Sequence, residues 1–357
     1  MVTVAEQRSH TLSPGPASVA EVMAEWQRLA EEGELLDFKV VPTGFTPLDD
    51  ILNGGLRPGE LAVLGGPYGV GKTVFGLQAA RNVALADERT KALYICYEHD
   101  RTHLLARLLC LESVEQGRRP GTDGDGDGPM DYDLTMRKLA ALTGGPTGAS
   151  NLFFTLRNDA RYANLLRALR RYGDRLILVR ASGATTGLDE INAWIEAART
   201  PGTESVLVVV DYIQKIAVDR GDYRDEDEIT TALMHGLKEM ALTQQVQMLA
   251  IAAADRPSLK GQRMRFADMR GSSAMQYETD IGLIMNNKFD IVSREHLIYN
   301  RSEAQTMRNL VVLTMEKNRA GRNAVDLEYV FDAPHFRFQA NGEFVRDRLI
   351  DGKVVLE

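Results

Sequence analysis

A glycine-rich segment of the chain has the residue types and spacing that hold phosphate groups. It fits the P-loop pattern G-x-x-x-x-G-K-[ST] and reads Gly66-Pro67-Tyr68-Gly69-Val70-Gly71-Lys72-Thr73. Backbone N–H groups of such a turn, with the positive end of the following helix dipole, form an anion site. We expect the Lys72 ammonium to reach the β- and γ-phosphates and the Thr73 hydroxyl to bind Mg²⁺. The segment therefore predicts a site for a nucleoside triphosphate, ATP or GTP, with Mg²⁺.

Two acidic residues stand where they could complete this site. Asp211 follows the most apolar run of the chain, residues 206–210, in the Walker B arrangement that brings a carboxylate to the Mg²⁺ shell. Glu98 follows another apolar run, residues 92–97, and its carboxylate could polarise the water that attacks the γ-phosphate. Either acid alone could be an ordinary side chain at a strand end. Together with the P-loop, they predict nucleotide hydrolysis.

Two basic residues near the C-terminal end carry a further possibility. Lys317 and Arg319 alternate with Asn318, so both side chains project to one face of an extended segment. Basic groups on a protruding turn are usually solvated. They could instead reach into a neighbouring subunit's nucleotide site and stabilise the charge of the transition state.

The elements that must position these residues alternate between apolar strands and amphipathic helices. Strands are predicted at residues 61–64, 92–97, 175–179, 206–210, 246–252 and 281–285, and helices at 73–86, 101–112, 159–172, 188–199 and 227–243. This alternation predicts an α/β fold with a mostly parallel sheet flanked by helices. The strands predicted last, residues 310–316 and 325–331, form a β-hairpin with its turn around residues 319–322.

The segments outside this alternation divide the chain. Residues 1–17 are predicted to be a flexible tail. Residues 18–40 are predicted to be a linker helix and its connection, because Ser18 and Glu21 form a capping box ahead of an amphipathic pattern. The apolar face of this helix must pack either on its own domain or on a neighbouring subunit. The main domain is predicted at residues 41–340, followed by a C-terminal extension at 341–357.

An acidic flexible insertion is predicted at about residues 113–150. Asp123, Asp125 and Asp127 alternate with glycine there and begin like a calcium-binding EF-hand loop. Position twelve of that loop is Leu134 instead of glutamate, and no strong flanking helix pair is evident. A disordered acidic insertion is therefore the favoured interpretation.

Composition limits the class of protein. The formal net charge of −8 argues against a surface that is basic throughout, but it leaves room for a local basic channel. The apolar runs are far shorter than the roughly 20 residues that a membrane span needs. Cys96 and Cys110 have no metal-ligand spacing and are expected to be buried thiols of a reduced, cytoplasmic protein. Residues 1–18 are polar and show no signal-peptide pattern.

An ordered set of short motifs resembles the RecA-like motor domain of DnaB-type replicative helicases. Besides the P-loop, the matching pieces are Thr43–Asp49, Tyr97-Glu98-His99, Leu105–Cys110, Val210–Gln214, Asp268-Met269-Arg270, Gln276–Asp280 and Lys317–Gly321. The resemblance implies a ring, usually a hexamer, with ATP between subunits and Mg²⁺ as its metal. It also implies single-stranded DNA as a partner.

The resemblance carries roles to particular residues. Glu98 resembles the catalytic glutamate and Asp211 the Walker B acid. Lys317 and Arg319 resemble the pair that acts on the neighbour's nucleotide. The central loop that contacts the strand backbone corresponds to Arg270, Gly271 and Ser273, and the helix at residues 18–32 corresponds to the linker helix that docks on the adjacent subunit.

The chain also departs from the family pattern. We expect no counterpart of the family's N-terminal primase-binding domain in this sequence, in which about 40 residues precede the motor domain. The strand at 246–252 leads to Ala252-Ala253-Ala254, where the family has a polar Ser-Gln nucleotide sensor. The loop at 288–308 is long and atypical.

Positive charge is still predicted to gather near the presumed pore, where aromatic residues are sparse. The basic residues are Lys260, Arg263, Arg265, Arg270 and Lys288, and the nearby aromatic residues are Phe266 and Tyr277. This composition favours backbone tracking over base stacking.

Two functions from different classes follow. The leading one is a homo-oligomeric, ring-forming, Mg²⁺-dependent ATPase of the DnaB-like class that moves on single-stranded nucleic acid. The alternative is a KaiC-like, nucleotide-gated assembly or regulatory ATPase that acts on a protein partner, which the missing sensor and the net acidity favour. A monomeric nucleotide-binding protein ranks last, because the hairpin pair and the leading helix would then have no use.

Overall fold

The computed structural model describes residues 15–33, 39–117, 133–144, 148–159, 162–219, 221, 225–253, 263–269, 272–292 and 306–350. Within these residues, ten strands form one sheet in the order β10-β8-β7-β6-β1-β5-β4-β2-β3, with β9 paired to β8. The strands are β1 Leu61–Gly65, β2 Thr90–Cys96, β3 Leu176–Arg180, β4 Ser205–Asp211, β5 Gln247–Ile251, β6 Ile281–Asn287, β7 Leu310–Asn318, β8 Val325–Asp332, β9 Arg337–Phe338 and β10 Glu343–Phe344.

The central strands of the sheet are parallel. β1 pairs in parallel with β5 and β6, and β4 pairs in parallel with β5 and β2, which in turn pairs with β3. The registers Leu64↔Ile251 and Cys96↔Asp211 align the carboxyl ends of these strands along one edge. β7 and β8 form the predicted antiparallel hairpin beside β6. The predicted α/β class with a mostly parallel sheet is confirmed.

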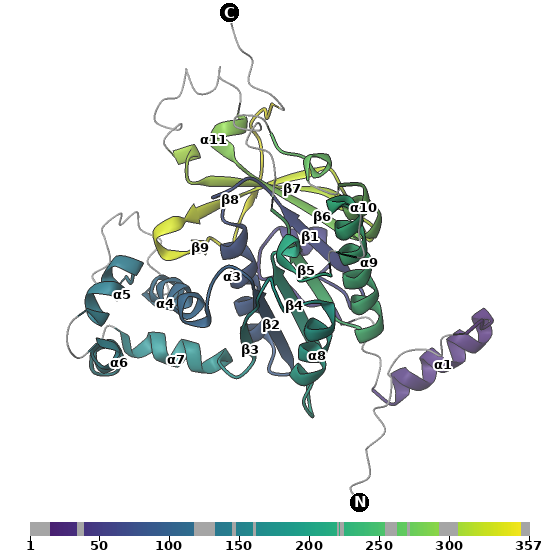
Figure 1. The fold of residues 1–357 in the computed structure, drawn as a ribbon, viewed down its shortest axis with the longest axis horizontal. Coiled ribbons are helices and arrows are strands. Elements are labelled where there is room, and N and C mark those ends of the chain that lie inside the picture. The colour runs from purple at the N-terminus through teal and green to yellow at the C-terminus, as the bar shows by residue number, and fades with distance from the viewer. Residues whose placement is uncertain are drawn as a thin grey trace, which may run out of the picture.

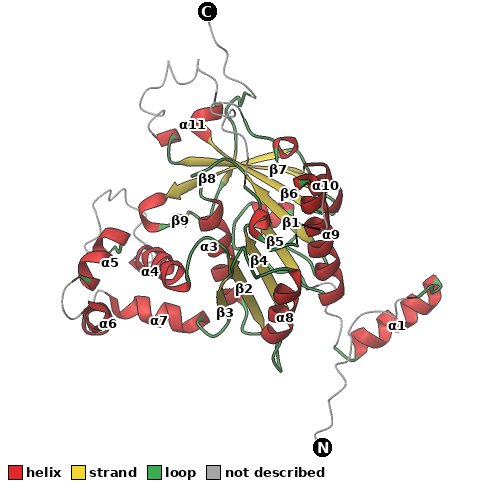
Figure 2. Ribbon diagram, in the orientation of Figure 1, coloured by secondary structure: helices red, strands yellow, loops and turns green. Residues whose placement is uncertain are grey.

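Helices cover both faces of this sheet (Figures 1 and 2). The helices of the described residues are α1 Val19–Glu31, which stands apart from the sheet, α2 Leu48–Ile51, α3 Lys72–Ala86, α4 Arg101–Gly117, α5 Met136–Thr143, α6 Gly148–Asn158, α7 Ala163–Tyr172, α8 Leu188–Ala198, α9 Glu226–Gln244, α10 Ser272–Glu278 and α11 Lys288–Ile291. Successive residues of a strand point to opposite faces. Ala62 and Leu64 of β1 therefore pack with α3, whereas Leu61 and Val63 pack in the core that includes α8 and α9.

The segment predicted as a flexible insertion contains helices that the sequence did not reveal. α5 lies within it and α6 begins at its end, and both pack with α4 in a small separate core. Leu139 and Leu152 bury against Leu109 and Cys110 there, which explains why the segment folds. The alternating Asp–Gly run, residues 123–128, lies outside the described residues.

The leading helix α1 begins with the predicted capping box. Glu21 N donates to Ser18 Oγ at 3.3 Å, and Ser18 N donates to Glu21 Oε2 at 2.7 Å. Figure 1 shows α1 projecting away from the sheet and its helices. Val19 is 77% exposed and Met23 is 64% exposed, so much of the apolar face does not pack on the chain's own domain.

Two further expectations concern thiols and membranes. Cys96 and Cys110 are buried free thiols, as predicted. Among the helices that the structure describes, none has both the length and the apolar composition needed to cross a lipid bilayer.

Candidate nucleotide site

The P-loop joins the end of β1 to the start of α3, and its glycines are required by its geometry. Gly66 has φ 149° and Gly71 has φ 98°, values that side chains with a Cβ rarely adopt. A Cβ on Gly66 would lie 2.5 Å from the Met285 carbonyl oxygen. Glycine at these positions therefore lets the loop pack closely against β6 and turn into the N-terminus of α3, where an anion site is expected.

Lys72 folds back over the loop. Its Nζ donates to the carbonyl oxygens of Gly66 at 2.7 Å and Pro67 at 2.9 Å. Burial lowers the pKa of Lys72 to about 8, and the nearby carboxylates of Asp211 and Glu98 only partly oppose this shift. The negative charge of a bound phosphate group would stabilise the charged form of Lys72 and raise its pKa again.

Asp211 and Thr73 form an oxygen pair at the carboxyl edge of the sheet. Asp211 ends β4 and is 1% exposed. Burial raises the pKa of its carboxyl group, while hydrogen bonds from Tyr94 and Thr73 act in the opposite direction. The Tyr94 hydroxyl donates to Asp211 Oδ2 at 2.7 Å and so fixes the carboxylate. A hydroxyl and a carboxylate are oxygen donors of the kind that Mg²⁺ takes alongside water and phosphate, so this pair fits the expected metal.

One cavity of about 370 Å³ is lined by most of the residues predicted for the nucleotide site of one subunit, though not by Gly66, Pro67 or Val70. Lys72, Thr73, Glu98 and Asp211 all line it. Glu98 stands two residues beyond β2, is exposed to the cavity, and is hydrogen-bonded to the Tyr212 hydroxyl. The geometry leaves this carboxylate accessible to a water molecule beside a bound phosphate.

Arg107 is a cavity residue that the sequence reasoning missed. Its guanidinium lies 5.0 Å from the ring centre of Phe336 and 2.9 Å from His99 Nε2. Its Nε is buried without a hydrogen-bond partner among the residues described. Phe331 and Phe336 also line the cavity, where they offer apolar surface to a nucleobase. The signal for Arg107 was a lone charge among the leucines of residues 104–109, in the first turns of a helix that starts at this sheet edge.

The pair predicted to act between subunits lies outside this cavity. Lys317 Nζ donates to the Gln276 carbonyl oxygen. Arg319 donates to Asp280 Oδ1 at 3.1 Å and to the Tyr277 carbonyl oxygen at 2.5 Å. Both side chains thus turn toward the C-terminal end of α10, and the Arg319 side chain remains 52% exposed. The described residues bring neither of them to the chain's own P-loop.

The expected basic cluster near the pore is wrong for most of its members. Arg263 is buried and pairs with Asp326, and Lys288 is buried between Glu328 and Asp347. Arg265 pairs with Glu316 at 3.4 Å. A buried charge needs a partner of opposite sign, and β7 and β8 supply most of these acids. Arg263 and Lys288 are therefore buried parts of the fold and not free to bind nucleic acid, and Arg265 is partly exposed and paired.

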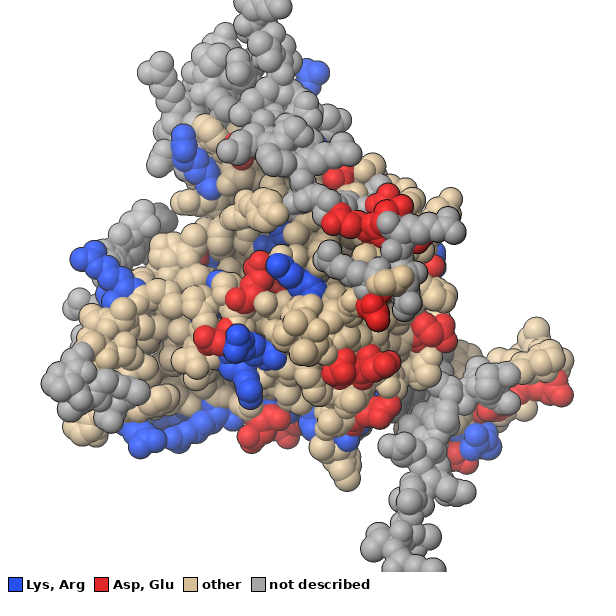
Figure 3. All heavy atoms as spheres, viewed as in Figure 1, with Lys and Arg blue, Asp and Glu red and all other residues tan. Residues whose placement is uncertain are grey.

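The other residues predicted to contact nucleic acid lie partly within and partly outside the described residues. Arg270, Gly271 and Lys260 lie outside the described residues, while Ser273 is exposed on α10. Phe266 is buried in the core and Tyr277 is 77% exposed. On the face shown in Figure 3, acidic side chains gather on the side of α8, α9 and α10, whereas Lys and Arg predominate along the edge beneath α7.

The end of β5 lacks the polar sensor, as the sequence indicated. Ala253 borders the nucleotide cavity and a neighbouring cavity of about 520 Å³. The Gln214 side chain binds both backbone polar groups of Ala253. Its Oε1 accepts from Ala253 N at 3.1 Å, and its Nε2 donates to Ala253 O at 3.2 Å. The methyl side chain of Ala253 has no polar atom with which to contact a γ-phosphate.

The depressed pKa of Lys72 predicts a pH dependence of nucleotide binding. Below pH 8 the lysine is already charged and ATP affinity should be nearly constant. Above pH 8 binding requires uptake of a proton, so the dissociation constant should rise by up to about tenfold per pH unit. Calorimetric titration in buffers of different ionisation enthalpy measures this uptake. Lys72→Arg, whose side chain stays charged, should lose the dependence, and an equal dependence in that variant would contradict the assignment.

Comparison with known proteins gives a family and a fold. The profile of the family described as "DnaB-like helicase C terminal domain" matches residues 40–120 and 132–340. The chain is 22% identical over 355 residues to a replicative DNA helicase DnaB of Haemophilus influenzae, covering 96% of this chain and 63% of that protein. It is 24% identical over 304 residues to the DnaB of Treponema pallidum, covering 85% and 56%. The chain thus spans roughly half to two thirds of the length of these relatives.

Solved structures of similar fold cover nearly all of the chain. A solved ATPase domain superposes with a TM-score of 0.66 at 18% identity, over 91% of this chain and 99% of that one. A DnaB-like replicative helicase studied with primase superposes with a TM-score of 0.65 at 18% identity, over 92% and 67%. Together with the sheet order, they confirm the predicted RecA-like fold.

Proposed function

The chain belongs to the DnaB-like helicase C-terminal domain family, and we propose that it is an Mg²⁺-dependent ATPase that forms a ring and moves on single-stranded nucleic acid. One observation carries the proposal. A single cavity gathers Lys72, Thr73, Glu98 and Asp211, while Lys317 near the end of β7 and Arg319 on the exposed turn that follows are held outside it. This is half of a site whose other half a neighbour would supply.

Within one subunit, each cavity residue has a separate task. The P-loop N–H groups and the Lys72 ammonium bind the phosphates. Thr73 and Asp211 would hold Mg²⁺, which would offset the phosphate charge. Glu98 orients the attacking water and accepts its proton. Arg107 adds a second positive charge from the wall that α4 contributes.

Assembly explains the features that a monomer would not use. Arg319 would reach the γ-phosphate of the adjacent subunit, where positive charge stabilises the transition state. The exposed apolar residues of α1, among them Val19 and Met23, would dock on the adjacent subunit. Identical head-to-tail contacts of this kind close into a ring when the rotation permits, and a hexamer is the proposed state.

The nucleic-acid part of the proposal rests on the family and on the loop around Arg270. The relatives are replicative DNA helicases by name. Arg270 and Gly271 precede α10 and Ser273 lies in its first turn. By their resemblance to the family, these residues would belong to the loop that contacts the strand in the central channel. A cytoplasmic location is consistent with this function.

A second candidate keeps the ring but changes the target. Ala253 offers no polar group to report the nucleotide state, and the paired Arg263 and Lys288 remove charge from the presumed channel. Both observations favour a nucleotide-gated regulatory ATPase that acts on a protein partner.

ATPase rates with and without single-stranded DNA decide between the two candidates. We expect DNA to stimulate the wild type several-fold, because strand binding would order the subunits of the ring, and binding to weaken steeply with salt. Arg270→Ala should lose most of the stimulation, whereas Arg167→Ala on the exposed face of α7 should keep it. Absence of stimulation and of salt-dependent binding in the wild type would exclude movement on DNA and leave the second candidate.

A further inference from the structure

The motif Gln276–Asp280 lies outside the nucleotide cavity, yet it holds both Lys317 and Arg319. Asp280 precedes β6 and its side chain is only 9% exposed. Its Oδ2 accepts from Leu61 N at 2.8 Å and from Lys238 Nζ at 2.7 Å, and its Oδ1 accepts from Arg319 at 3.1 Å. The Asp280 carbonyl oxygen also accepts from Arg319 N at 3.0 Å. One residue therefore fixes both the backbone and the side chain of Arg319.

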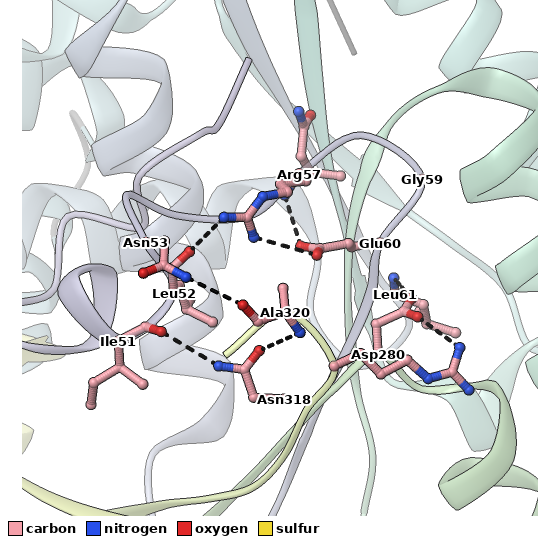
Figure 4. Close-up of polar contacts among 12 residues, drawn as sticks. Ile51, Leu52, Asn53, Arg57, Gly59, Glu60, Leu61, Asp280, Asn318 and Ala320 are labelled. Carbon is pink, nitrogen blue, oxygen red and sulfur yellow. Dashed lines mark hydrogen bonds and ion pairs between the residues drawn. The ribbon is translucent and has the colours of Figure 1, made fainter. Parts of the chain in front are cut away.

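The turn that carries Arg319 is clamped from its other side as well. Asn318 Nδ2 donates to the carbonyl oxygens of Ile51 and Arg322, while its Oδ1 accepts from Ala320 N at 3.1 Å. Asn53 Nδ2 donates to Ala320 O at 3.3 Å. Figure 4 shows Asn318, the last residue of β7, and Ala320 of the turn facing Ile51, the last residue of α2, and Asn53 of the loop that follows it. These hydrogen bonds hold the backbone of the turn, so the orientation of the Arg319 guanidinium depends mainly on the contacts of its own side chain.

The charges around Asp280 leave Arg319 effective as a cation. Two cations, Lys238 and Arg319, share one carboxylate, so a net positive charge remains at the turn. Arginine has five N–H donors in a rigid fork, and the bonds to Asp280 and to the Tyr277 carbonyl oxygen use two of them. The remaining donors, on a half-exposed side chain, are available to a phosphate group.

We propose that Asp280 is a positioning residue, which holds the Arg319 guanidinium in the orientation that a neighbouring subunit's nucleotide requires. The inference rests on the proposed function, in which Arg319 acts between subunits. Asp280 would contact neither ATP nor the reacting atoms. An arginine without this partner would sample many rotamers, and the site it serves would lose catalytic rate with little change in nucleotide affinity.

Mixed rings test this role separately from any effect of Asp280 on its own strand β1. Subunits with Lys72→Ala have no working P-loop but supply an intact Arg319, and subunits with Arg319→Ala supply the reverse. Mixing them should restore ATP hydrolysis at junctions where the two meet. We expect the same mixture made with a Lys72→Ala/Asp280→Asn double variant to recover about tenfold less hydrolysis. Harm to that subunit's own nucleotide site is invisible, because Lys72→Ala has already disabled it.

Two further variants complete the test. Lys72→Ala/Lys238→Met removes the other cation from Asp280 and should recover as much activity as Lys72→Ala alone. Lys72→Ala/Asp280→Glu keeps the carboxylate and should recover at least half as much. Equal recovery with Asp280→Asn, or an equal loss with Lys238→Met, would overturn the positioning role. Should Asp280→Asn fail to assemble, an equal loss of recovery in the Lys238→Met and Asp280→Glu mixtures would still overturn the role. Failure of the simple Lys72→Ala and Arg319→Ala mixture would instead contradict the proposed function.

Discussion

Replacing Arg319 with alanine is expected to lower ATP hydrolysis by the assembled protein about a thousandfold, because positive charge supplied between subunits to a phosphoryl transition state is worth at least that much. ATP affinity should change by less than about threefold, since Arg319 does not line its own subunit's cavity and contributes mainly in the transition state. Steady-state hydrolysis and equilibrium binding of a fluorescent ATP analogue measure the two quantities separately.

Arg322→Ala is the matched control for this change. Arg322 is an exposed arginine on the same turn, and the bond it makes to Asn318 uses its backbone carbonyl, which the substitution keeps. Hydrolysis should stay near the wild-type rate. If Arg319→Ala abolished nucleotide binding as well as turnover, Arg319 would belong to its own subunit's site or to the fold.

Glu98→Gln should slow hydrolysis by a factor of about a hundred to ten thousand while ATP stays bound. The amide keeps the size and polarity of the side chain but cannot accept the proton of the attacking water. Tight binding without turnover should leave an oligomer trapped with ATP, which single-turnover kinetics and particle mass both detect. Glu88→Gln, on the exposed loop before β2, should behave as wild type. Unchanged turnover in Glu98→Gln would remove this residue from the mechanism.

The nucleotide half-site could be predicted because each of its three segments is recognisable from a short stretch of sequence. The P-loop is contiguous, and Glu98 and Asp211 follow apolar runs that had to be parallel strands of one sheet. Carboxyl ends of parallel strands meet at a common edge, so three distant segments could be placed together without knowing the strand order. The fold class followed from the same alternation.

The place of Arg107 in the site and the partners of the paired cations were not predicted, for a different reason. Arg107 enters the site because η6, residues Ala333–His335, brings Phe336 beside α4, a contact between segments far apart in sequence. Arg263 and Lys288 form ion pairs with acidic residues of β8, and no periodic sequence pattern predicts such a pairing. The satellite core of α5 and α6 was missed because a glycine-rich acidic run interrupts the helical pattern there.

The central claim is that each nucleotide site is completed by a neighbouring subunit, and subunit mixing tests it most directly. Lys72→Ala and Arg319→Ala proteins are each expected to be nearly inactive alone. Mixed in equal amounts before ATP is added, they should recover about a quarter of the wild-type rate, because about one junction in four joins an intact P-loop to an intact Arg319. A mixture that stays as inactive as its components, although its particles contain both kinds of subunit, would contradict the shared site.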